Sequence, residues 1–323
     1  MKKRLRQIFL IIIAVFAITA IYYLHYIFIP EKIFTLFQST KTQSNKYIKS
    51  SDDPVLLAVG DIGDCNTDND EKIAKLMEKI PGTIALLGDT VYENGTWEEF
   101  MNCFDPAWGK LKSRIKPAVG NHEYHTKNAE SYFRYFGKSA GDFGKGYYSY
   151  NLGTWHIIAL NSQICAVDKN CINSEQIRWL IKDLEKYKSY KCTLAYRHHP
   201  RFSSGANSSD VALGPFWEIL YKNGVDVILS GHDHDYERFA PQTPKGIKDE
   251  IYGIRSFVVG TGGKSLEDFS KNANNSEVRN NLSYGILKLS LGLGKYSWEF
   301  LPTEEKTFSD NGEGICHDAP TVH

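Results

Sequence analysis

Five short apolar runs, each ending in a glycine or a polar cluster, constrain the fold of this chain most. They are rich in aliphatic and β-branched residues, as buried strands are. They cover Val55–Val59, Thr83–Leu87, Ile115–Val119, Thr193–Tyr196 and Val225–Leu229. Between them lie stretches with the apolar spacing of a helix, such as Ile73–Ile80 and Ile177–Leu184, the latter with Asn173 as its expected N-cap. This alternation predicts an α/β fold.

Further strands in the second half of the chain predict a second sheet. A hairpin is expected where Tyr147–Tyr150 and Trp155–Leu160 flank a turn at Asn151-Leu152-Gly153. Three more strands, Arg255–Val259, Tyr284–Leu291 and Lys295–Phe300, are joined by tight turns. We therefore expect a two-sheet β-sandwich flanked by helices. The length of 323 residues alone would allow two domains, but the continuous pattern predicts one domain over residues 54–323.

The overall composition excludes two broad classes of protein. The 38 basic side chains balance the 38 acidic ones, so no nucleic-acid partner is predicted. Hydrophobic residues make up 42% of the chain and charged residues 24%, and there is no tract of low complexity. Such a chain can bury a large core and is expected to fold rather than to stay disordered.

The N-terminus has the pattern of a membrane anchor. Lys2, Lys3, Arg4 and Arg6 precede an apolar run from Ile8 to Ile29, which exceeds the roughly 20 residues needed to cross a bilayer. We expect residues 1–29 to form a cytoplasmic basic tip and one transmembrane helix, and residues 30–53 a linker. The remaining chain would then lie on the extracytoplasmic side, periplasmic or extracellular/lumenal.

The alternative is a cleaved signal peptide, with a small-residue cleavage site near Ala17 and Ala20. The protein would then be secreted. The apolar run is longer than the core of a signal peptide, which favours the anchor.

Six cysteines follow the apolar run, and their even number fits an oxidising compartment. They are Cys65, Cys103, Cys165, Cys171, Cys192 and Cys316. None forms a Cys-x-x-Cys pair, which argues against a structural zinc site. Cys165 and Cys171 are close enough in sequence to form a disulfide within one loop. The spacing leaves the other pairings open, and free buried thiols are the alternative.

Potential metal ligands follow the five predicted strands. The strand ends read Gly60-Asp61, Gly88-Asp89-Thr90-Val91-Tyr92, Gly120-Asn121-His122-Glu123, His198-His199-Pro200 and Gly231-His232-Asp233-His234. In open α/β sheets, ligands bind at the carboxyl ends of the strands, so these loops can meet in one crevice. Each motif alone has an ordinary explanation, such as an aspartate that caps a turn. The prediction of a metal centre rests on all five together.

This ordered series, from about Leu56 to Arg238, resembles the calcineurin-like metallophosphoesterase superfamily. Tyr92, three residues after Asp89, makes the chain similar to the purple acid phosphatases. The resemblance implies the four-layer fold of that superfamily and two metal ions that share Asp89. One ion would be held by Asp61, Asp89, Tyr92 and His234, and the other by Asp89, Asn121, His198 and His232.

The chemistry of the two ligand sets predicts two different ions. Two carboxylates and a phenolate are hard anionic donors that favour Fe(III), and a phenolate on Fe(III) would colour the protein purple. The second set, with an amide oxygen and two imidazoles, suits a divalent Zn, Mn or Fe ion.

The resemblance further implies a dinuclear metal-dependent phosphatase that hydrolyses phosphomonoesters by attack of a metal-bound hydroxide. It makes His122 the catalytic residue, which contacts the substrate and protonates the leaving group. Asn121, His122 and His199 are the expected substrate-binding residues. The loop after His199 lacks the additional histidines common in the family, so His199 and His125 remain candidates for a second acid. Glu123, Asp233, Asp235, Glu237 and Arg238 are expected to be structural partners.

Two other functions use the same motifs. One is a phosphodiesterase or nucleotide pyrophosphatase with the same centre, because the motifs define the metals and not the leaving group. The other is a non-catalytic phosphoester-binding protein that keeps the scaffold. Gly263-Lys264-Ser265 resembles the end of a P-loop, but Val258 occupies the position that needs glycine, so we interpret it as a turn after a strand.

Overall fold

The computed structural model describes residues 53–167, 171–207, 211–303 and 308–320. The predicted basic tip and membrane anchor, and nearly all of the predicted linker, lie outside these residues. Among the residues that the structure describes, no helix is long and apolar enough to cross a membrane.

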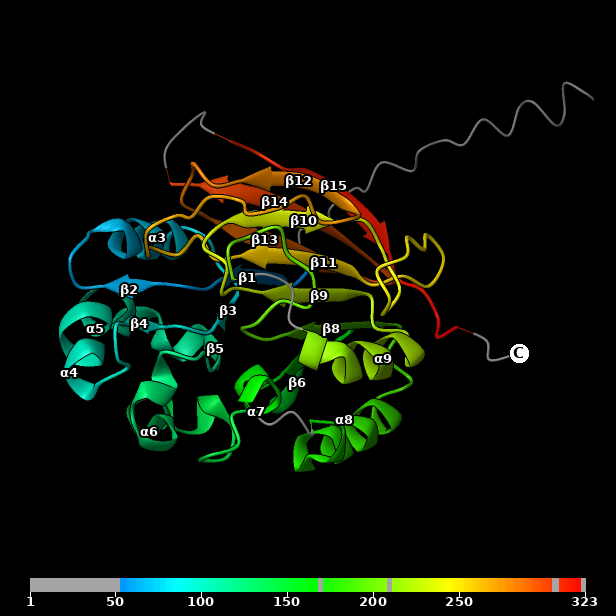
Figure 1. Cartoon of the computed structure of the whole chain (residues 1–323), viewed down its shortest axis with the longest axis horizontal. Coiled ribbons are helices and arrows are strands. Elements are labelled where there is room, and N and C mark those ends of the chain that lie inside the picture. Colours follow the sequence, from blue (N-terminus) through cyan, green and yellow to red (C-terminus); the bar gives the residue numbers. More distant parts are fainter. Residues whose placement is uncertain (1–52, 168–170, 208–210, 304–307, 321–323) are drawn as a thin grey trace, which may run out of the picture. The chain divides into compact units, whose positions relative to one another are not determined.

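Two mixed β-sheets lie face to face in the centre of the fold (Figure 1). The first has the order β15-β14-β13-β1-β3-β5 and the second the order β12-β10-β11-β9-β8-β7-β6. Strands β1, β3 and β5 are parallel to one another, as are β7, β8, β9 and β11. The first sheet contains β1 (Val55–Val59), β3 (Thr83–Leu87), β5 (Ile115–Ala118), β13 (Gly285–Gly292), β14 (Lys295–Pro302) and β15 (Asn311–Ile315).

The second sheet contains β6 (Tyr148–Leu152), β7 (Trp155–Ala159), β8 (Cys192–Tyr196), β9 (Val227–Ser230), β10 (Tyr236–Phe239), β11 (Arg255–Val259) and β12 (Ser276–Asn280). A short parallel pair, β2 (Gly63–Asp64) with β4 (Val91–Tyr92), extends beyond the first sheet. The helices are α3 (Asn69–Glu78), α4 (Trp97–Glu99), α5 (Asp105–Trp108), α6 (Glu130–Phe136), α7 (Ser162–Val167), α8 (Glu175–Lys186) and α9 (Gly214–Lys222). A π-helical turn, η1 (Phe100–Phe104), joins α4 to α5, and short 3-10 turns complete the connections.

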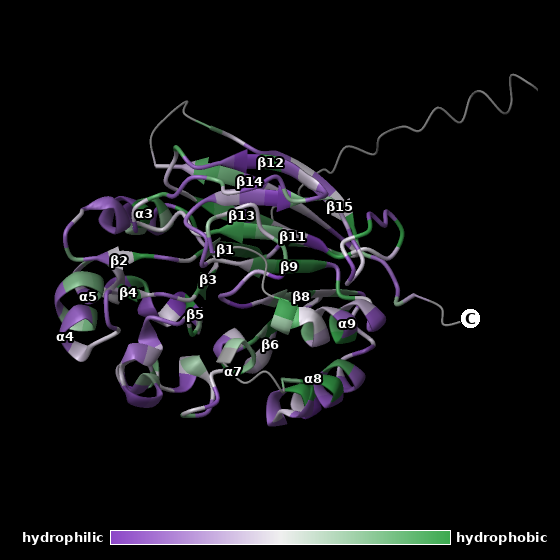
Figure 2. Ribbon diagram, viewed as in Figure 1, coloured by the Kyte–Doolittle hydropathy of each residue, from purple (hydrophilic) through white to green (hydrophobic). Residues whose placement is uncertain are grey.

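Three apolar layers hold the sheets and helices together. Alternate residues of β1 face opposite ways, so Leu56 packs between the two sheets, whereas Leu57 packs against the helices beside the first sheet. Trp108 of α5 belongs to that second layer, and Trp217 of α9 belongs to a third layer on the far side of the second sheet. The apolar strands in the centre are visible in Figure 2. The predicted two-sheet α/β sandwich flanked by helices is therefore confirmed.

Several element boundaries differ from the sequence prediction. Ser174, not Asn173, is the N-cap of α8, because its side chain accepts a hydrogen bond from the Ile177 N–H. Strand β9 begins at Val227, two residues later than predicted, and Asp226 just before it accepts hydrogen bonds from the Thr193 and His317 N–H groups with its side chain. The predicted hairpin is present as β6 and β7, which pair antiparallel from Tyr148 with Ala159 to Leu152 with Trp155.

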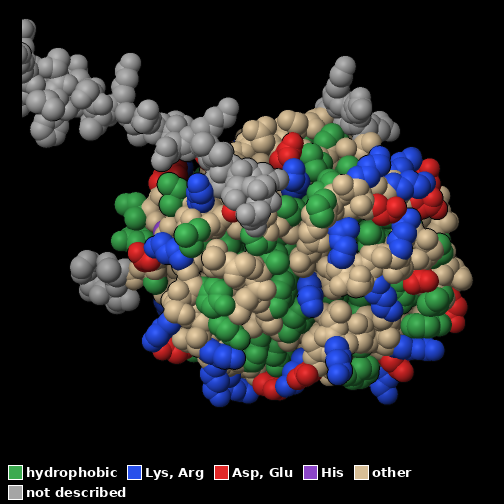
Figure 3. Space-filling view, turned by 180° about the vertical axis from the view of Figure 1, so that it is seen from behind, with side chains coloured by type: hydrophobic (Ala, Val, Ile, Leu, Met, Phe, Trp, Pro, Cys, Tyr) green, Lys and Arg blue, Asp and Glu red, His purple; other side chains and the backbone are tan. Residues whose placement is uncertain are grey.

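All six cysteines form disulfides: Cys65–Cys103, Cys165–Cys171 and Cys192–Cys316. The predicted Cys165–Cys171 pair is confirmed. The cysteines of the second and third disulfides are buried, whereas Cys65 is exposed. Acidic and basic side chains intermingle on the face shown in Figure 3, as the balanced charge of the chain leads one to expect.

Candidate metal centre

The candidate ligands follow parallel strands of both sheets at their carboxyl ends. Asp61 follows β1, Asp89 follows β3 and Asn121 follows β5 in the first sheet, while His198 follows β8 and His232 follows β9 in the second. The two sheets are joined there by a hydrogen bond from the Gly60 N–H to the Val259 carbonyl oxygen, 2.9 Å long. The strand ends of both sheets therefore meet at a single site.

Unusual backbone conformations turn three of these residues inward. Asp61, Asp89 and His232 have φ angles of 60°, 47° and 75°, a region that residues with a Cβ seldom occupy. Such strain, of order 1 kcal/mol or more each, is typical of functional sites. The loops also pack closely at this site. A Cβ on Gly120 would lie 2.1 Å from Asp89 Oδ1, so only glycine fits there.

A first group of side chains gathers around the Tyr92 hydroxyl. Its Oη lies 2.9 Å from Asp61 Oδ1, 3.2 Å from Asp89 Oδ2 and 3.2 Å from His234 Nε2. His234 Nδ1 donates a hydrogen bond to the Ser265 carbonyl oxygen over 3.0 Å. In the neutral ring, Nε2 of His234 therefore directs a lone pair at the phenol.

A second group gathers around His198. Its Nδ1 donates to the Leu87 carbonyl oxygen over 2.8 Å. Its Nε2 lies 3.1 Å from Asp89 Oδ2, 3.0 Å from Asn121 Oδ1 and 3.1 Å from His232 Nδ1. Each of these atoms carries a lone pair in the neutral side chain or the carboxylate.

The two groups fit a pair of cations. Converging lone pairs repel one another unless a proton or a metal ion lies between them. Imidazoles that donate one ring N–H to a backbone carbonyl and direct the other nitrogen at such a cluster are typical of metal-bound histidines. Asp89 Oδ2 contacts both groups, so this carboxylate is placed to bridge two ions. The structure thus brings together Asp61, Asp89, Tyr92 and His234 on one side, and Asp89, Asn121, His198 and His232 on the other.

Burial and mutual charge set the protonation of these side chains when no cation is present. Burial raises the pKa of Asp61 to about 6. Burial would also raise the pKa of Asp89, but His198 and His122 outweigh it and lower that pKa. Burial likewise opposes a charge on His198, yet the carboxylate of Asp89 raises the pKa of His198 to about 9.

His232 and Tyr92 are held neutral. Burial, aided by the charge on His198, lowers the pKa of His232 to about 3. Burial and the carboxylates of Asp61 and Asp89 raise the pKa of Tyr92 well above its usual value. His198 Nε2 lies 3.1 Å from Asp89 Oδ2, so a proton on that nitrogen would have to leave before these two side chains could bind a cation.

Glu123 fixes the two loops that carry Asp89 and Asn121. Its buried carboxylate accepts hydrogen bonds from the backbone N–H groups of Asp89 (3.1 Å), Thr90 (2.6 Å) and Gly120 (2.7 Å). Burial and the neighbouring charge of Asp89 raise the pKa of Glu123 to about 8. Glu123 thus holds two ligand loops in register without facing the cluster itself.

Three further histidines lie around this cluster in different ways. His122 and His125 both direct Nδ1 at the Glu93 carbonyl oxygen, over 2.7 and 2.9 Å. His122 Nε2 lies 3.8 Å from Asp89 Oδ2, and the side chain is 22% exposed. His199 is buried behind His198 and His232, where its Nδ1 lies 2.9 Å from the hydroxyl of Ser162. Only His122 combines closeness to the cluster with access from solvent.

Sequence reasoning missed several contacts of this site. The Leu87 and Ser265 carbonyl oxygens orient His198 and His234, but every residue has a carbonyl, so no sequence signal marks them. Ser162 begins α7 and matches no motif, and the sequence around Lys264 predicts only a turn. A different group, Cys192, Asp226 and Cys316, places its ligand atoms within 4.8 Å of one another, but the two cysteines form a disulfide and offer no thiolates.

The calcineurin-like phosphoesterase family model matches residues 54–236. Purple acid phosphatase 15 of Arabidopsis thaliana is 29% identical over 219 residues, which are 57% of this chain and 40% of that protein. Acid phosphatase type 7 of Homo sapiens is 26% identical over 219 residues, 58% of this chain and 48% of that protein. The match thus spans less than half the length of these relatives.

A solved structure shows the same fold. The structure of the purple acid phosphatase PPD1 from yellow lupin seeds superimposes with a TM-score of 0.70 at 18% sequence identity. The match covers 84% of this chain and 55% of the lupin protein. At this identity the likeness concerns the fold alone.

Proposed function

The chain belongs to the calcineurin-like phosphoesterase family, and from this premise we propose that it is a dinuclear metal-dependent phosphatase of the purple acid phosphatase type, which hydrolyses phosphomonoesters. The observation that supports the proposal most is that the candidate ligands converge in two adjoining groups of four lone-pair donors each. Asp89 belongs to both groups. The spacing of about 3 Å within each group is too close for such donors without a proton or a cation between them.

We assign a trivalent iron to Asp61, Asp89, Tyr92 and His234, and a divalent Zn, Mn or Fe ion to Asp89, Asn121, His198 and His232. The first set carries three anionic oxygen donors and the second only the shared carboxylate, so the two sets differ in charge and hardness. When bound, two such ions supply Lewis acid stabilisation of a phosphoryl group and lower the pKa of a water molecule.

The side chains around the ions would position the substrate and move its protons. His122 reaches the cluster from the solvent side, and the Glu93 carbonyl oxygen holds its Nδ1, so Nε2 is left to face a phosphoester. We assign it the proton transfer to the leaving group. Asn121 lies next to it on the same loop. His199 is buried and hydrogen-bonded to Ser162, so we place it behind the second ion rather than in contact with the leaving group.

We also propose that the domain is displayed outside the cytoplasm and held at the membrane by the N-terminal segment. Three disulfides among the described residues support an oxidising compartment. The basic residues before the apolar run support the orientation. Cleavage of that segment would instead release the protein. N-terminal sequencing of the mature protein distinguishes the two outcomes.

An Asp89→Asn variant tests the proposed activity. It keeps the shape of the side chain but removes the charge shared by both groups, so we expect loss of at least one bound metal and of nearly all hydrolysis of p-nitrophenyl phosphate. The matched control is Asp142→Asn, because Asp142 is 80% exposed. Bis-p-nitrophenyl phosphate in parallel separates monoesterase from diesterase activity. Full activity in Asp89→Asn, or a parent protein without metal, would contradict the proposal.

A further inference from the structure

Lys264 lies against Tyr92, although the sequence around Lys264 predicts only a turn. Its Nζ lies 4.7 Å from the centroid of the Tyr92 ring, a distance at which a cation and an aromatic ring attract one another. The Lys264 backbone N–H also donates to the carbonyl oxygen of Asp61 over 3.1 Å. One residue therefore contacts two candidate ligands of the same ion.

Two glycines allow the chain to approach so closely. The Gly262 N–H donates to the Gly60 carbonyl oxygen over 3.0 Å, and a Cβ on Gly262 would come within 2.3 Å of that oxygen. A Cβ on Gly263 would come within 2.4 Å of the Ile62 carbonyl oxygen. The glycines of this turn thus serve to bring Lys264 to the metal loops and not to bind a phosphate.

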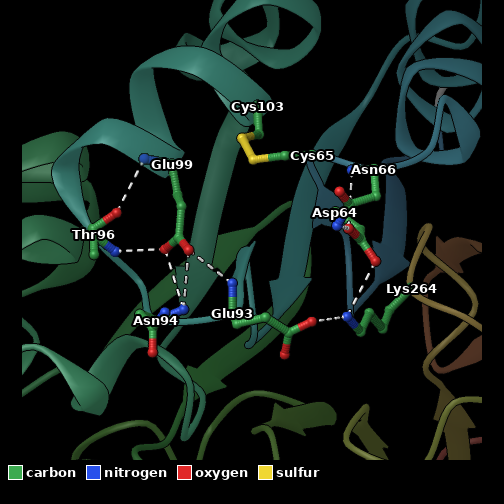
Figure 4. The surroundings of a disulfide bond; sticks show 9 residues. All are labelled: Asp64, Cys65, Asn66, Glu93, Asn94, Thr96, Glu99, Cys103 and Lys264. Atoms are coloured by element: carbon green, nitrogen blue, oxygen red, sulfur yellow. Dashed lines mark hydrogen bonds and ion pairs between the residues drawn. A yellow bond between two sulfur atoms is a disulfide. The ribbon is translucent and has the colours of Figure 1, made fainter.

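The ammonium group of Lys264 is fixed in place from two sides. It forms ion pairs with Asp64, over 3.1 Å, and with Glu93, and Figure 4 shows it between these two carboxylates. Asp64 is held in turn by Asn66, and Glu99 accepts the Glu93 N–H. The Lys264 side chain is only 17% exposed, so water screens its charge weakly.

The charges around Tyr92 give this cation a role. The carboxylate oxygens of Asp61 and Asp89 lie 2.9 and 3.2 Å from the Tyr92 hydroxyl oxygen, where their negative charge would repel a phenolate. A phenolate ligand would therefore need a compensating positive charge in addition to the metal ion. Lys264 supplies such a positive charge over the face of the ring. The two carboxylates that bind its ammonium group reduce the effect of this charge in part.

We propose that Lys264 is a positioning residue that stabilises Tyr92 as a phenolate ligand and thereby sets the energy of its electronic transition to the metal. The inference rests on the proposed function, because it needs Fe(III) bound to Tyr92. A nearby cation lowers the energy of the phenolate electrons, which widens the gap to the acceptor orbitals of the iron. Removal of that cation should shift the purple absorption band to longer wavelength.

The visible spectra of three variants of the full-length protein test this inference. Lys264→Met keeps the aliphatic stem and loses the charge, and we expect unchanged metal content with a band at longer wavelength than that of the parent. Lys264→Arg keeps the positive charge, so its band should lie at the wavelength of the parent. Glu93→Gln removes one carboxylate from the ammonium group and should shift the band to shorter wavelength; Glu93 is 57% exposed, so this variant is expected to fold.

The outcomes separate the inference from the function. A coloured parent whose band is at the same wavelength in Lys264→Met and in Glu93→Gln would overturn the role of Lys264 and leave the phosphatase proposal standing. A parent that binds no iron and has no band would overturn both. If Lys264→Met fails to fold, Glu93→Gln alone decides, because its expected shift has the opposite sign.

Discussion

Replacement of Glu123 by glutamine tests how the metal loops are held in place. Glu123 Oε2 accepts from Asp89 and Gly120, and Oε1 accepts from Thr90 over 2.6 Å. The glutamine oxygen can take over the first two hydrogen bonds, but its NH₂ group must then face the Thr90 N–H. Two donors would thus oppose each other in a buried position.

The expected cost follows from these contacts. Loss of the hydrogen bond to the carboxyl oxygen, with a buried N–H left unpaired, costs about 3 kcal/mol. At pH 5 the burial that raises the pKa of Glu123 from 4.5 to about 8 costs the folded state only about 1 kcal/mol, which the neutral glutamine returns, so the comparison is made at that pH. The net loss is about 2 kcal/mol in the free energy of unfolding, which lowers the melting temperature by roughly 5 °C for a domain of this size.

Thermal unfolding of the EDTA-treated protein measures this loss, and metal titration of the same samples measures the second consequence. Because the loops of Asp89 and Asn121 lose their common anchor, we expect metal affinity to fall by about 10- to 100-fold. Glu130→Gln is the matched control, since Glu130 is exposed at the start of α6. A melting temperature and metal affinity equal to those of the parent in Glu123→Gln would refute this reasoning.

Three further outcomes follow from the same structure. His122→Ala should retain both metals but lose about 100-fold or more in turnover of phosphomonoesters; retained turnover would remove His122 from the proton transfer. Burial raises the pKa of Asp226 from 3.8 to about 7, so the folded state binds a proton that the unfolded state releases between these values; its contribution of up to about 4 kcal/mol is present below pH 4 and is lost as the pH rises through 7. Urea unfolding across this range in the parent and in Asp226→Asn should show a weaker pH dependence in the variant, and equal slopes would contradict the assignment. The Cys192–Cys316 disulfide closes a separation of 124 residues, so Cys192→Ser/Cys316→Ser should lose about 5 kcal/mol of stability by the chain-entropy argument; an unchanged urea midpoint under non-reducing conditions would show that other contacts already fix this end of the chain.

The parts of the fold that the sequence predicted are those with a local signature. Strands β1, β3 and β8 have continuous apolar runs, and the residues after them match known ligand motifs. The boundary of α8 was missed by one residue because Asn173 and Ser174 are both good N-caps, and only the three-dimensional contact with the Ile177 N–H decides between them.

Contacts between distant segments were not predictable in the same way. The Cys65–Cys103 and Cys192–Cys316 pairings depend on which loops meet in space, which spacing alone does not define. Lys264 follows Asp64 by 200 positions, and the surrounding sequence, which predicts only a turn, gives no sign that its side chain reaches Asp64. The orientation of His198 by the Leu87 carbonyl oxygen likewise comes from the arrangement of two sheets.

Elemental analysis of the purified full-length protein, together with its visible spectrum, tests the central claim most directly. The account predicts two metal ions per chain, one of them iron, and a purple band that disappears in Tyr92→Phe because the phenolate ligand is lost. A parent protein that contains no stoichiometric metal, or a purple band that persists in Tyr92→Phe, would contradict it.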